Sequence, residues 1–238
     1  NAGLNFRHKT KKGLFKVYGS YNDSNFELNR NDLDNNNAKT KYKLQNNNYY
    51  INSSYKGKLG KQWLLKAGGS YTNNRDRVSI NTNQFNETLE LGHFKGVISR
   101  KLTKQIKLTL GAESILKTYT QSYLTNEEDL NFNFEDATLA AFAESNIYFS
   151  KKLVARIGGR FEYASHINKT NLSPRFSMAY QTGENSQVSI AAGTFYQQGR
   201  NDYMIYTDQL DFEKANQYMV NYQWAKNKRT LRGEVYLK

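Results

Sequence analysis

Hydrophobic residues occupy every second position over long stretches of this chain. In residues 147–163, "IYFSKKLVARIGGRFEY", the apolar set is interleaved with polar and charged residues such as Arg156 and Arg160. Similar alternation recurs in residues 63–71, 106–113, 188–197 and 217–224. Because successive side chains of a strand point to opposite faces, this period of two predicts strands with one apolar and one polar face.

Short and long polar segments alternate between the predicted strands. The short ones predict tight hairpin connections at residues 10–13, 60–62, 103–105, 150–152, 183–186 and 226–228. The long ones predict loops at roughly residues 29–45, 80–87, 124–136, 165–171 and 199–212. Together they predict about twelve antiparallel strands joined in consecutive hairpins, longer than the ~5–6 residues usual in soluble proteins.

Two all-β architectures fit such alternation, and they bury opposite faces. A soluble sandwich turns its apolar face inward and mixes its strand order in Greek keys. Here the strands are long and strictly consecutive, and the polar face carries Lys66, Arg156, Arg160, Glu162 and Arg175 in mid-strand. Inside a bilayer every backbone amide must pair internally, which a closed barrel of tilted strands achieves. The pattern favours an antiparallel up-and-down transmembrane β-barrel with apolar side chains outside.

Composition agrees with this interpretation. Only 38% of the residues are hydrophobic, yet 14% are aromatic, which argues against disorder. The chain has no cysteine, which excludes a disulfide framework and a thiolate metal site. The net charge of +13 is spread over regularly spaced turns rather than concentrated in one patch, so we predict contacts with anionic headgroups of the outer-membrane lipid, and no nucleic-acid partner.

The two ends of the chain are expected on the same side of the barrel. The first predicted strand, 2–10, enters a short turn, and the last, 229–238, leaves one. Both ends are therefore expected on the loop side. We expect residues 1–238 to be one transmembrane barrel segment, an interior run of strands from a larger barrel.

Two segments carry a family resemblance. Residues 171–198, "NLSPRFSMAYQTGENSQVSIAAGTFYQQ", resemble the "LSPR" strand and its partner in TonB-dependent outer-membrane receptors. Residues 208–238 resemble the next strand pair of the same receptors, except that Phe212 stands where proline is frequent and Asn221 where glycine is frequent. The wealth of asparagine, lysine and tyrosine is similar to receptors of the Bacteroidota.

The resemblance implies more than these residues do. It implies a barrel of about 22 strands in the bacterial outer membrane, closed by a plug whose TonB box engages the energy-coupling complex. No segment of this chain matches a plug or a TonB box. The implied function is energy-coupled uptake of a bulky nutrient such as a siderophore, glycan or peptide, with a surface lipoprotein or other subunits as further partners. The alternative is a non-transporting barrel that acts as a scaffold subunit of a membrane complex. The residues do not identify the substrate.

The candidate substrate contacts lie on the polar face and in the long loops. Inner arginines suit an anionic ligand or, alternatively, an ion-pair ladder with Glu144, Glu162 and Glu234. Loop tyrosines suit stacking on a sugar, peptide or siderophore. The candidates are Arg156, Arg160, Arg175, His166, Tyr203 and Tyr206.

No enzymatic or metal-binding pattern stands out. His8, His93 and His166 have no metal-ligand spacing, and no nucleophile motif is present. An acidic run is interpreted as a solvated loop that contacts lipopolysaccharide through bridging divalent cations, with a cation or iron-complex site as the alternative; it comprises Glu127, Glu128, Asp129, Glu135 and Asp136. We predict no enzymatic activity, no cofactor and no resident metal.

Overall fold

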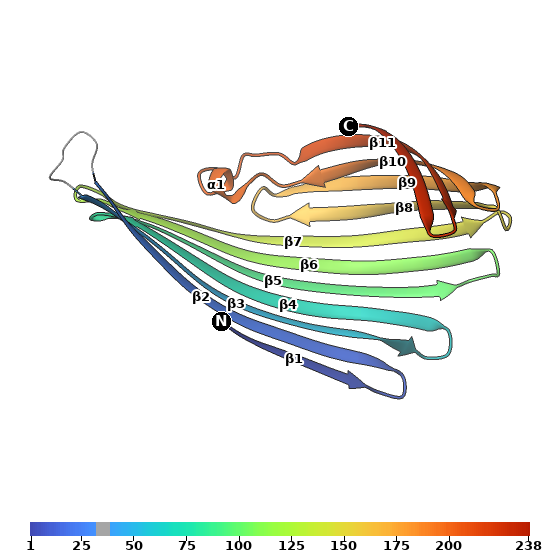
Figure 1. Ribbon diagram of the computed structural model, residues 1–238, viewed down its shortest axis with the longest axis horizontal. Helices are drawn as coiled ribbons and strands as arrows, with labels where there is room; N and C mark the ends of the chain where they lie inside the picture. The colour runs from blue at the N-terminus through green and yellow to red at the C-terminus, as the bar shows by residue number, and fades with distance from the viewer. Residues whose placement is uncertain (32–38) are drawn as a thin grey trace.

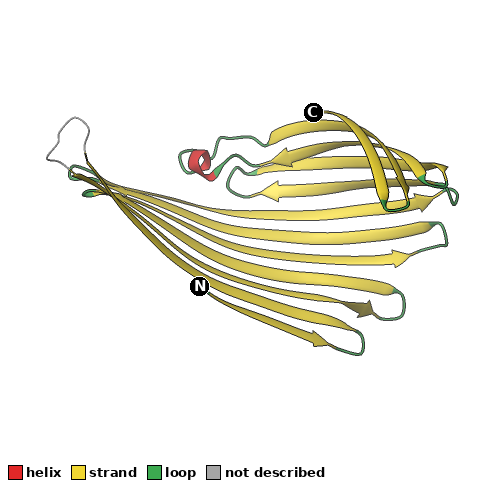
Figure 2. Ribbon diagram, viewed as in Figure 1, coloured by secondary structure: helices red, strands yellow, loops and turns green. Residues whose placement is uncertain are grey.

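The computed structural model describes residues 1–31 and 39–238 and consists almost entirely of β-strands (Figures 1 and 2). The only helix among the described residues is α1 (Asn201–Met204), which has neither the length nor the apolar character to cross a membrane. The strands are β1 (Ala2–Lys9), β2 (Gly13–Asn31), β3 (Lys39–Leu59), β4 (Trp63–Ile80), β5 (Asn83–Lys101), β6 (Ile106–Leu124), β7 (Asp129–Tyr148), β8 (Leu153–Ala164), β9 (Lys169–Gly183), β10 (Ser186–Gln197), β11 (Glu213–Lys226) and β12 (Arg229–Leu237).

All twelve strands form one antiparallel sheet in sequence order, β1 to β12. Each strand pairs with its neighbours along the chain, from Ala2 opposite Tyr21 to Lys226 opposite Arg229. The predicted strand number and the consecutive hairpin order are therefore confirmed. In the described residues β1 and β12 are the two edges of an open, curved sheet (Figure 1).

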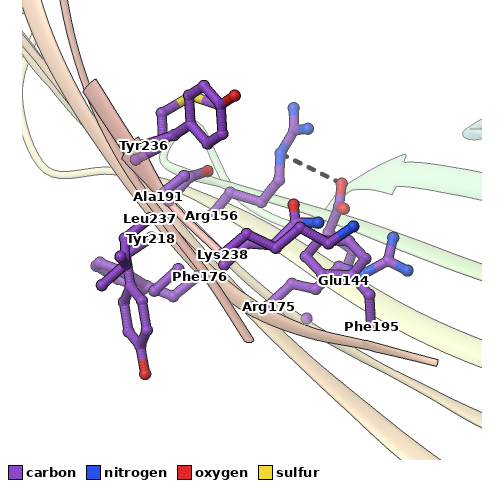
Figure 3. Close-up of a pocket in the computed structure, with 16 residues that line it drawn as sticks. Glu144, Arg156, Arg175, Phe176, Ala191, Phe195, Tyr218, Tyr236, Leu237 and Lys238 are labelled. Atoms are coloured by element: carbon purple, nitrogen blue, oxygen red, sulfur yellow. Dashed lines mark ion pairs between the residues drawn. The ribbon is translucent and has the colours of Figure 1, made fainter. Parts of the chain in front are cut away.

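The two faces of the sheet differ as the alternation predicts. Ile157 and Val220 are 56% and 53% exposed, so they are not packed together between two sheets. Their chain neighbours Arg156 and Asn221 point to the opposite face. Figure 3 shows the same division, with Phe176 and Tyr218 on one side of the ribbon and Arg156 and Arg175 on the other. We call the apolar side the outer face and the charged side the inner face.

All six predicted short turns are present at one end of the sheet. Local polar groups close them: the Thr10 hydroxyl accepts the Gly13 N–H at 2.9 Å, and the Ser150 hydroxyl accepts the Leu153 N–H at 3.1 Å. At the turn between β11 and β12, Asn227 and Lys228 both have positive φ, of 50° and 62°. This geometry matches the right-handed twist of the two strands that it joins.

Two of the predicted long loops are wrong. Residues 80–87 contain only a two-residue turn, in which Asn81 has φ 54°, and residues 124–136 contain only the turn 125–128. The strands on either side continue instead, so β2–β7 project far beyond the loop-side ends of β8–β11 (Figure 1). In the predicted loop 29–45, β2 extends to Asn31 and β3 begins at Lys39, while residues 32–38 lie outside the described residues.

The projecting strands have polar outer positions, whereas apolar residues such as Phe132 and Phe134 lie on their inner face. Their ladder is reinforced by side-chain bonds: Asn46 donates to Asp76 at 2.7 Å, and Asn86 donates to Ser122 at 3.1 Å. Backbone pairing needs no apolar face once water surrounds the sheet. An apolar outer face therefore identifies the lipid-facing part of each strand, whereas backbone pairing continues beyond it.

Adjacent residues of β10 test the assignment of the two faces. Ile190→Arg places a cation on the outer face and is expected to destabilise the folded barrel by about 2–4 kcal/mol if it lies near the bilayer centre. Ser189→Arg places the same side chain on the inner face and is expected to change stability by less than about 1 kcal/mol. Urea unfolding of the intact receptor in lipid vesicles measures both. Equal losses for the two variants would contradict the assignment.

Candidate functional site

The inner face carries a network of ion pairs centred on Glu113 of β6. The Glu113 carboxylate lies 2.6 Å from His93 Nε2 and 3.1 Å from Lys95 Nζ, and it also accepts a bond from Arg160 Nη1. Arg160 donates to Glu162 at 2.7 Å as well. The side chains of Glu113 and Arg160 are only 10% and 19% exposed. Each charge in this network is compensated by an opposite charge, as burial requires.

Small residues on the neighbouring strands allow this network to form. Ala140 of β7 stands opposite both Glu113 and Glu162, so Arg160 reaches Glu113 across a strand whose side chain there is a methyl group. Next to it, the ring of Phe142 covers Gly111, where a Cβ atom would come within 2.1 Å of the ring. Lys95 Nζ lies 5.4 Å from the centre of that ring. A glycine and an alanine thus position the aromatic and charged side chains around them.

A second feature is a hollow of about 410 Å³ on the inner face of β7–β12 (Figure 3). Arg156 pairs with Glu144 at 3.3 Å and donates to Asn146 at 2.9 Å. The Arg175 guanidinium lies 4.8 Å from the centre of the Phe195 ring. Two cations and an aromatic ring beside a solvent-filled space are suited to an anionic or aromatic ligand.

The third feature is at the loop end, where residues 198–212 fold onto the inner face. Met204 is 1% exposed, and it packs with Ile205 and Phe212 against the wall residues Tyr119 and Phe134. The cluster also contains the buried residues Ala164 and Ile167. Four partly buried side chains pack against it: Leu89, Phe132, Tyr196 and Leu210. This is the largest group of buried apolar side chains among the described residues. It holds the segment in place without covering the tyrosines at its tip.

Asp136 of β7 anchors two connections to the wall. This residue is only 3% exposed. Its carboxylate accepts hydrogen bonds from the His166 backbone N–H at 3.0 Å, from Gln198 Nε2 at 3.0 Å and from the Thr138 hydroxyl at 2.9 Å. His166 in turn bonds the Met204 carbonyl oxygen through Nε2 at 2.9 Å. The β8–β9 turn and the β10–β11 segment are therefore tied to the same carboxylate.

A further contact fixes the far end of this segment. Lys169 pairs with Asp211 at 2.9 Å, and the Phe212 N–H donates to the Asp211 carboxylate at 2.7 Å. The hydrogen bond from Lys169, followed by that from the Phe212 N–H, lowers the pKa of Asp211 below its usual range. A lowered carboxyl pKa means that this contact is present at neutral pH and is lost as the pH falls through the lowered value.

The six predicted contact residues fall into two groups. Arg156, Arg160 and Arg175 lie in the lumen, whereas His166, Tyr203 and Tyr206 lie at the loop end. The expected ladder is present for Arg156 and Arg160, and Arg232 pairs with Glu234, while Arg175 packs on Phe195 instead.

The candidates also differ in accessibility. The His166 ring and the Arg160 guanidinium are engaged in internal bonds. Tyr203 and Tyr206 are 60% and 66% exposed, and Tyr206 stacks edge-on against Phe132 at 5.2 Å. The tyrosines are therefore accessible to a ligand, whereas His166 and Arg160 hold the wall and its loops in shape.

Sequence reasoning missed the two central carboxylates. The alternation places Glu113 on the polar face of its strand, but it does not indicate the three side chains that Glu113 bonds, which are 18–47 positions away in the chain. Asp136 belongs to the acidic run that was interpreted as a solvated loop, and that interpretation is wrong for it, because it is a buried β7 residue. No group of three His, Cys, Asp or Glu residues suited to a metal ion occurs in the part of the chain that the structure describes.

Removing the central carboxylate tests the lumen network. Glu113→Gln is expected to lower the free energy of unfolding by about 1–3 kcal/mol, because Arg160 and Lys95 lose a charged acceptor in a nearly enclosed site. Glu234→Gln breaks the more exposed pair with Arg232 and is expected to cost at most about 1 kcal/mol. Urea unfolding in lipid vesicles compares the two variants. If Glu113→Gln lowered the free energy of unfolding no more than Glu234→Gln does, Glu113 would not be the centre of the network.

Removing Asp136 tests the anchoring of the loop end. Asp136→Ala leaves three buried donors without their acceptor, at about 1–3 kcal/mol each, so chymotrypsin is expected to cleave within 198–212 at least about tenfold faster. The strands should resist cleavage as before. Asp202→Asn is the control, because it weakens only the exposed pair with Arg200. Unchanged cleavage of the Asp136 variant would show that the apolar cluster alone holds the segment.

Comparisons with known proteins agree with this architecture. A family model described as "TonB dependent receptor-like, beta-barrel" matches residues 1–238. Among curated protein sequences, none matches this chain. The structure superposes on the outer membrane transporter YddB from Escherichia coli with a TM-score of 0.76 at 11% identity, covering 95% of this chain and 37% of that one.

Two further solved structures are similar. The alcaligin outer-membrane receptor FauA from Bordetella pertussis gives a TM-score of 0.74 at 12% identity, covering 98% of this chain and 41% of that one. The RagAB peptide transporter gives a TM-score of 0.73 at 11% identity, covering 98% of this chain and 39% of that one. The chain thus spans less than half of each of these proteins.

These matches concern outer-membrane receptors and transporters, which are not enzymes. They confirm the predicted family, the predicted all-β fold as part of a larger barrel, and the predicted location in the bacterial outer membrane. With the whole of residues 1–238 matched by the family model, this chain belongs to the TonB-dependent receptor β-barrel family.

Proposed function

We propose that this chain forms part of the wall of a receptor that takes up a bulky nutrient across the outer membrane, with energy supplied through the TonB complex. On this proposal residues 1–238 are entirely barrel wall. The plug and its TonB box then belong to other parts of the receptor. The proposal extends the family membership to transport by this protein.

The observation that carries the proposal is the construction of the inner face. Its most buried charges, Glu113 and Arg160, are compensated within the wall, whereas Arg175 has no ion-pair partner among the described residues and packs on Phe195. At the loop end the wall carries a packed segment, 198–212, that presents exposed aromatic rings. A polar channel beneath an aromatic rim is suited to admit and capture a large polar solute.

The candidate residues take different parts in this function. Tyr203 and Tyr206 are proposed as first contacts, because their rings are exposed at the tip of a fixed segment. Arg156 and Arg175 are proposed as contacts deeper in the lumen, beside the hollow of about 410 Å³. Arg160 and His166 are proposed as positioning residues, since their side chains are engaged by Glu113 and by the Met204 carbonyl oxygen.

The proposed substrate class is a nutrient too large for passive diffusion, such as a siderophore, a glycan or a peptide. Structures similar to this chain include an alcaligin receptor, a ferric yersiniabactin uptake receptor and a peptide transporter. Aromatic rings stack on each of these classes, so the residues at the rim support the class without selecting one member. A surface lipoprotein or another subunit is proposed as a further partner at the loop end.

Growth and binding together test the proposal. A deletion strain grown on single nutrient sources identifies the substrate, and Tyr203→Ala/Tyr206→Ala is then expected to weaken its binding to the intact receptor by about tenfold, since each stacked ring contributes about 0.5–1.5 kcal/mol. Tyr203→Phe/Tyr206→Phe keeps the rings and is expected to bind nearly as the parent does. Tyr148→Ala, at the short-turn end, is the control for general damage.

The outcomes separate transport from a scaffold role. Slow growth of the deletion strain on one nutrient, restored by the parent gene and not by the double alanine variant, supports uptake. A deletion strain that grows normally on every nutrient tested, yet loses another protein from an outer-membrane complex, would overturn uptake in favour of a scaffold.

A further inference from the structure

The outer face of β2–β4 changes from apolar to polar at a row of tyrosines. On β4 the outward positions are apolar up to Tyr71 and polar from Asn73 onward. On the neighbouring strands the change occurs at Tyr49 and at Tyr21, whose rings lie 4.8 Å apart. Tyr49 and Tyr71 are 50% and 43% exposed. Amphipathic rings at the end of an apolar belt mark the boundary between acyl chains and headgroups.

Directly beyond this row the structure has a hollow of about 550 Å³. By alternation most of its lining residues belong to the outer face, among them Tyr49, Tyr71, Asn73, Arg75 and Arg77. Because the tyrosines mark the membrane boundary on the loop side, the hollow lies at the level of the outer-leaflet headgroups. It is therefore separate from the lumen and from the proposed path of a nutrient.

The two arginines provide an anion-binding edge. Arg75 and Arg77 are two residues apart on β4, so their side chains leave the same face of the strand. Among the described residues neither forms an ion pair; Arg77 Nε donates to Asn86 Oδ1 at 3.0 Å, which leaves its other guanidinium donors free of protein partners there. Both residues are exposed. Paired guanidinium groups of this kind bind phosphate oxygens in a bidentate manner.

Asn73 adds a polar group that needs a donor. The residue is 6% exposed, and its Nδ2 donates to Glu90 Oε1 at 2.8 Å. Since an ionised carboxylate only accepts, this bond fixes the orientation of the amide and leaves Oδ1 without a hydrogen-bond partner. A buried acceptor in this state is costly unless a ligand or water supplies a donor. Sugar hydroxyl and amide N–H groups are such donors.

We propose that this hollow binds the phosphorylated amino-sugar headgroup of an outer-leaflet glycolipid. Arg75 and Arg77 bind its phosphate, and the Asn73 carbonyl oxygen accepts a bond from a sugar hydroxyl or amide. Tyr49 and Tyr71 pack against the sugar and the first part of its acyl chains. The inference is independent of the transport function, because the site faces the membrane and not the lumen.

The remaining charges around the hollow are compatible with this ligand. Asp76 and Glu87 also line it, but alternation turns their side chains toward the inner face, where Asp76 accepts from Asn46 and Asn74. Glu90 is engaged by Asn73 and by the Tyr71 hydroxyl at 3.3 Å. Asp23 is the outward carboxylate in the lining, and it stands two strands away from Arg75 in the paired register.

The test titrates the intact receptor in detergent with three probes: diphosphorylated lipid A, fully dephosphorylated lipid A, and inorganic phosphate. The parent protein is expected to bind the diphosphorylated lipid at least about tenfold more tightly than the dephosphorylated one. Arg75→Gln/Arg77→Gln is expected to weaken binding of the diphosphorylated lipid by about 10- to 30-fold, since each basic residue at a charged lipid surface contributes about a fivefold factor. Native mass spectrometry counts the bound lipid.

Two controls make the result interpretable. Lys11→Gln/Lys12→Gln removes the same charge from the short turn between β1 and β2, at the other end of the sheet, and should bind the lipid as the parent does. The heat-dependent gel shift in detergent checks that every variant retains a folded barrel. Equal binding by Arg75→Gln/Arg77→Gln and the parent would overturn the proposal, as would equal binding of phosphorylated and dephosphorylated lipid. Displacement of the lipid by millimolar inorganic phosphate would assign the site to a free anion instead.

Discussion

Backbone hydrogen bonding inside a bilayer is the constraint on which this structure depends. Acyl chains offer no donor or acceptor, so every N–H and C=O that crosses them must pair with a neighbouring strand. The continuous ladder from β1 to β12 satisfies this requirement everywhere except at the outward edges of β1 and β12 in the described residues. Once backbone pairing is satisfied, side chains alone decide which face meets lipid, and the alternation of Ile157 with Arg156 or Ile190 with Ser189 follows from that.

The inner face solves a different electrostatic problem from the outer face. Charges in a lumen are partly withdrawn from water, and each needs a partner to offset its lost hydration. Glu113 illustrates the solution, because it joins residues of β5 and β8 across an alanine of β7. At the loop end the same principle is applied with Asp136, which satisfies donors from two connections. Both carboxylates join segments that are distant in the chain, and Asp136 in this way ties two loop-end connections to the wall.

The boundary between membrane and water divides the strands into two regimes. On the short-turn side of the tyrosine row, outward side chains such as Leu65 are apolar, and the alternation of apolar and polar residues identifies the strands. Above it, outward residues such as Asn73 and Arg77 are polar, yet backbone pairing continues to the turn at Asn81. The wall therefore rises beyond the membrane as a solvated sheet held by backbone bonds and by side-chain bonds such as Asn46 to Asp76. Length of strand and length of apolar belt are separate quantities in this fold.

The sequence by itself determined the strand order, the two faces and the short turns, because a period of two and a polar break are local signals. It also placed Arg156 and Arg160 on the inner face and supplied two of their partners, Glu144 and Glu162. Tertiary structure alone decided that residues 80–87 and 124–136 extend strands, that Asp136 is buried, and that 198–212 packs inward on Tyr119 and Phe134. Those outcomes depend on neighbours far away in the chain, such as Gln198 and Asp136, which are 62 positions apart, and no local pattern specifies which distant donor will reach a given acceptor.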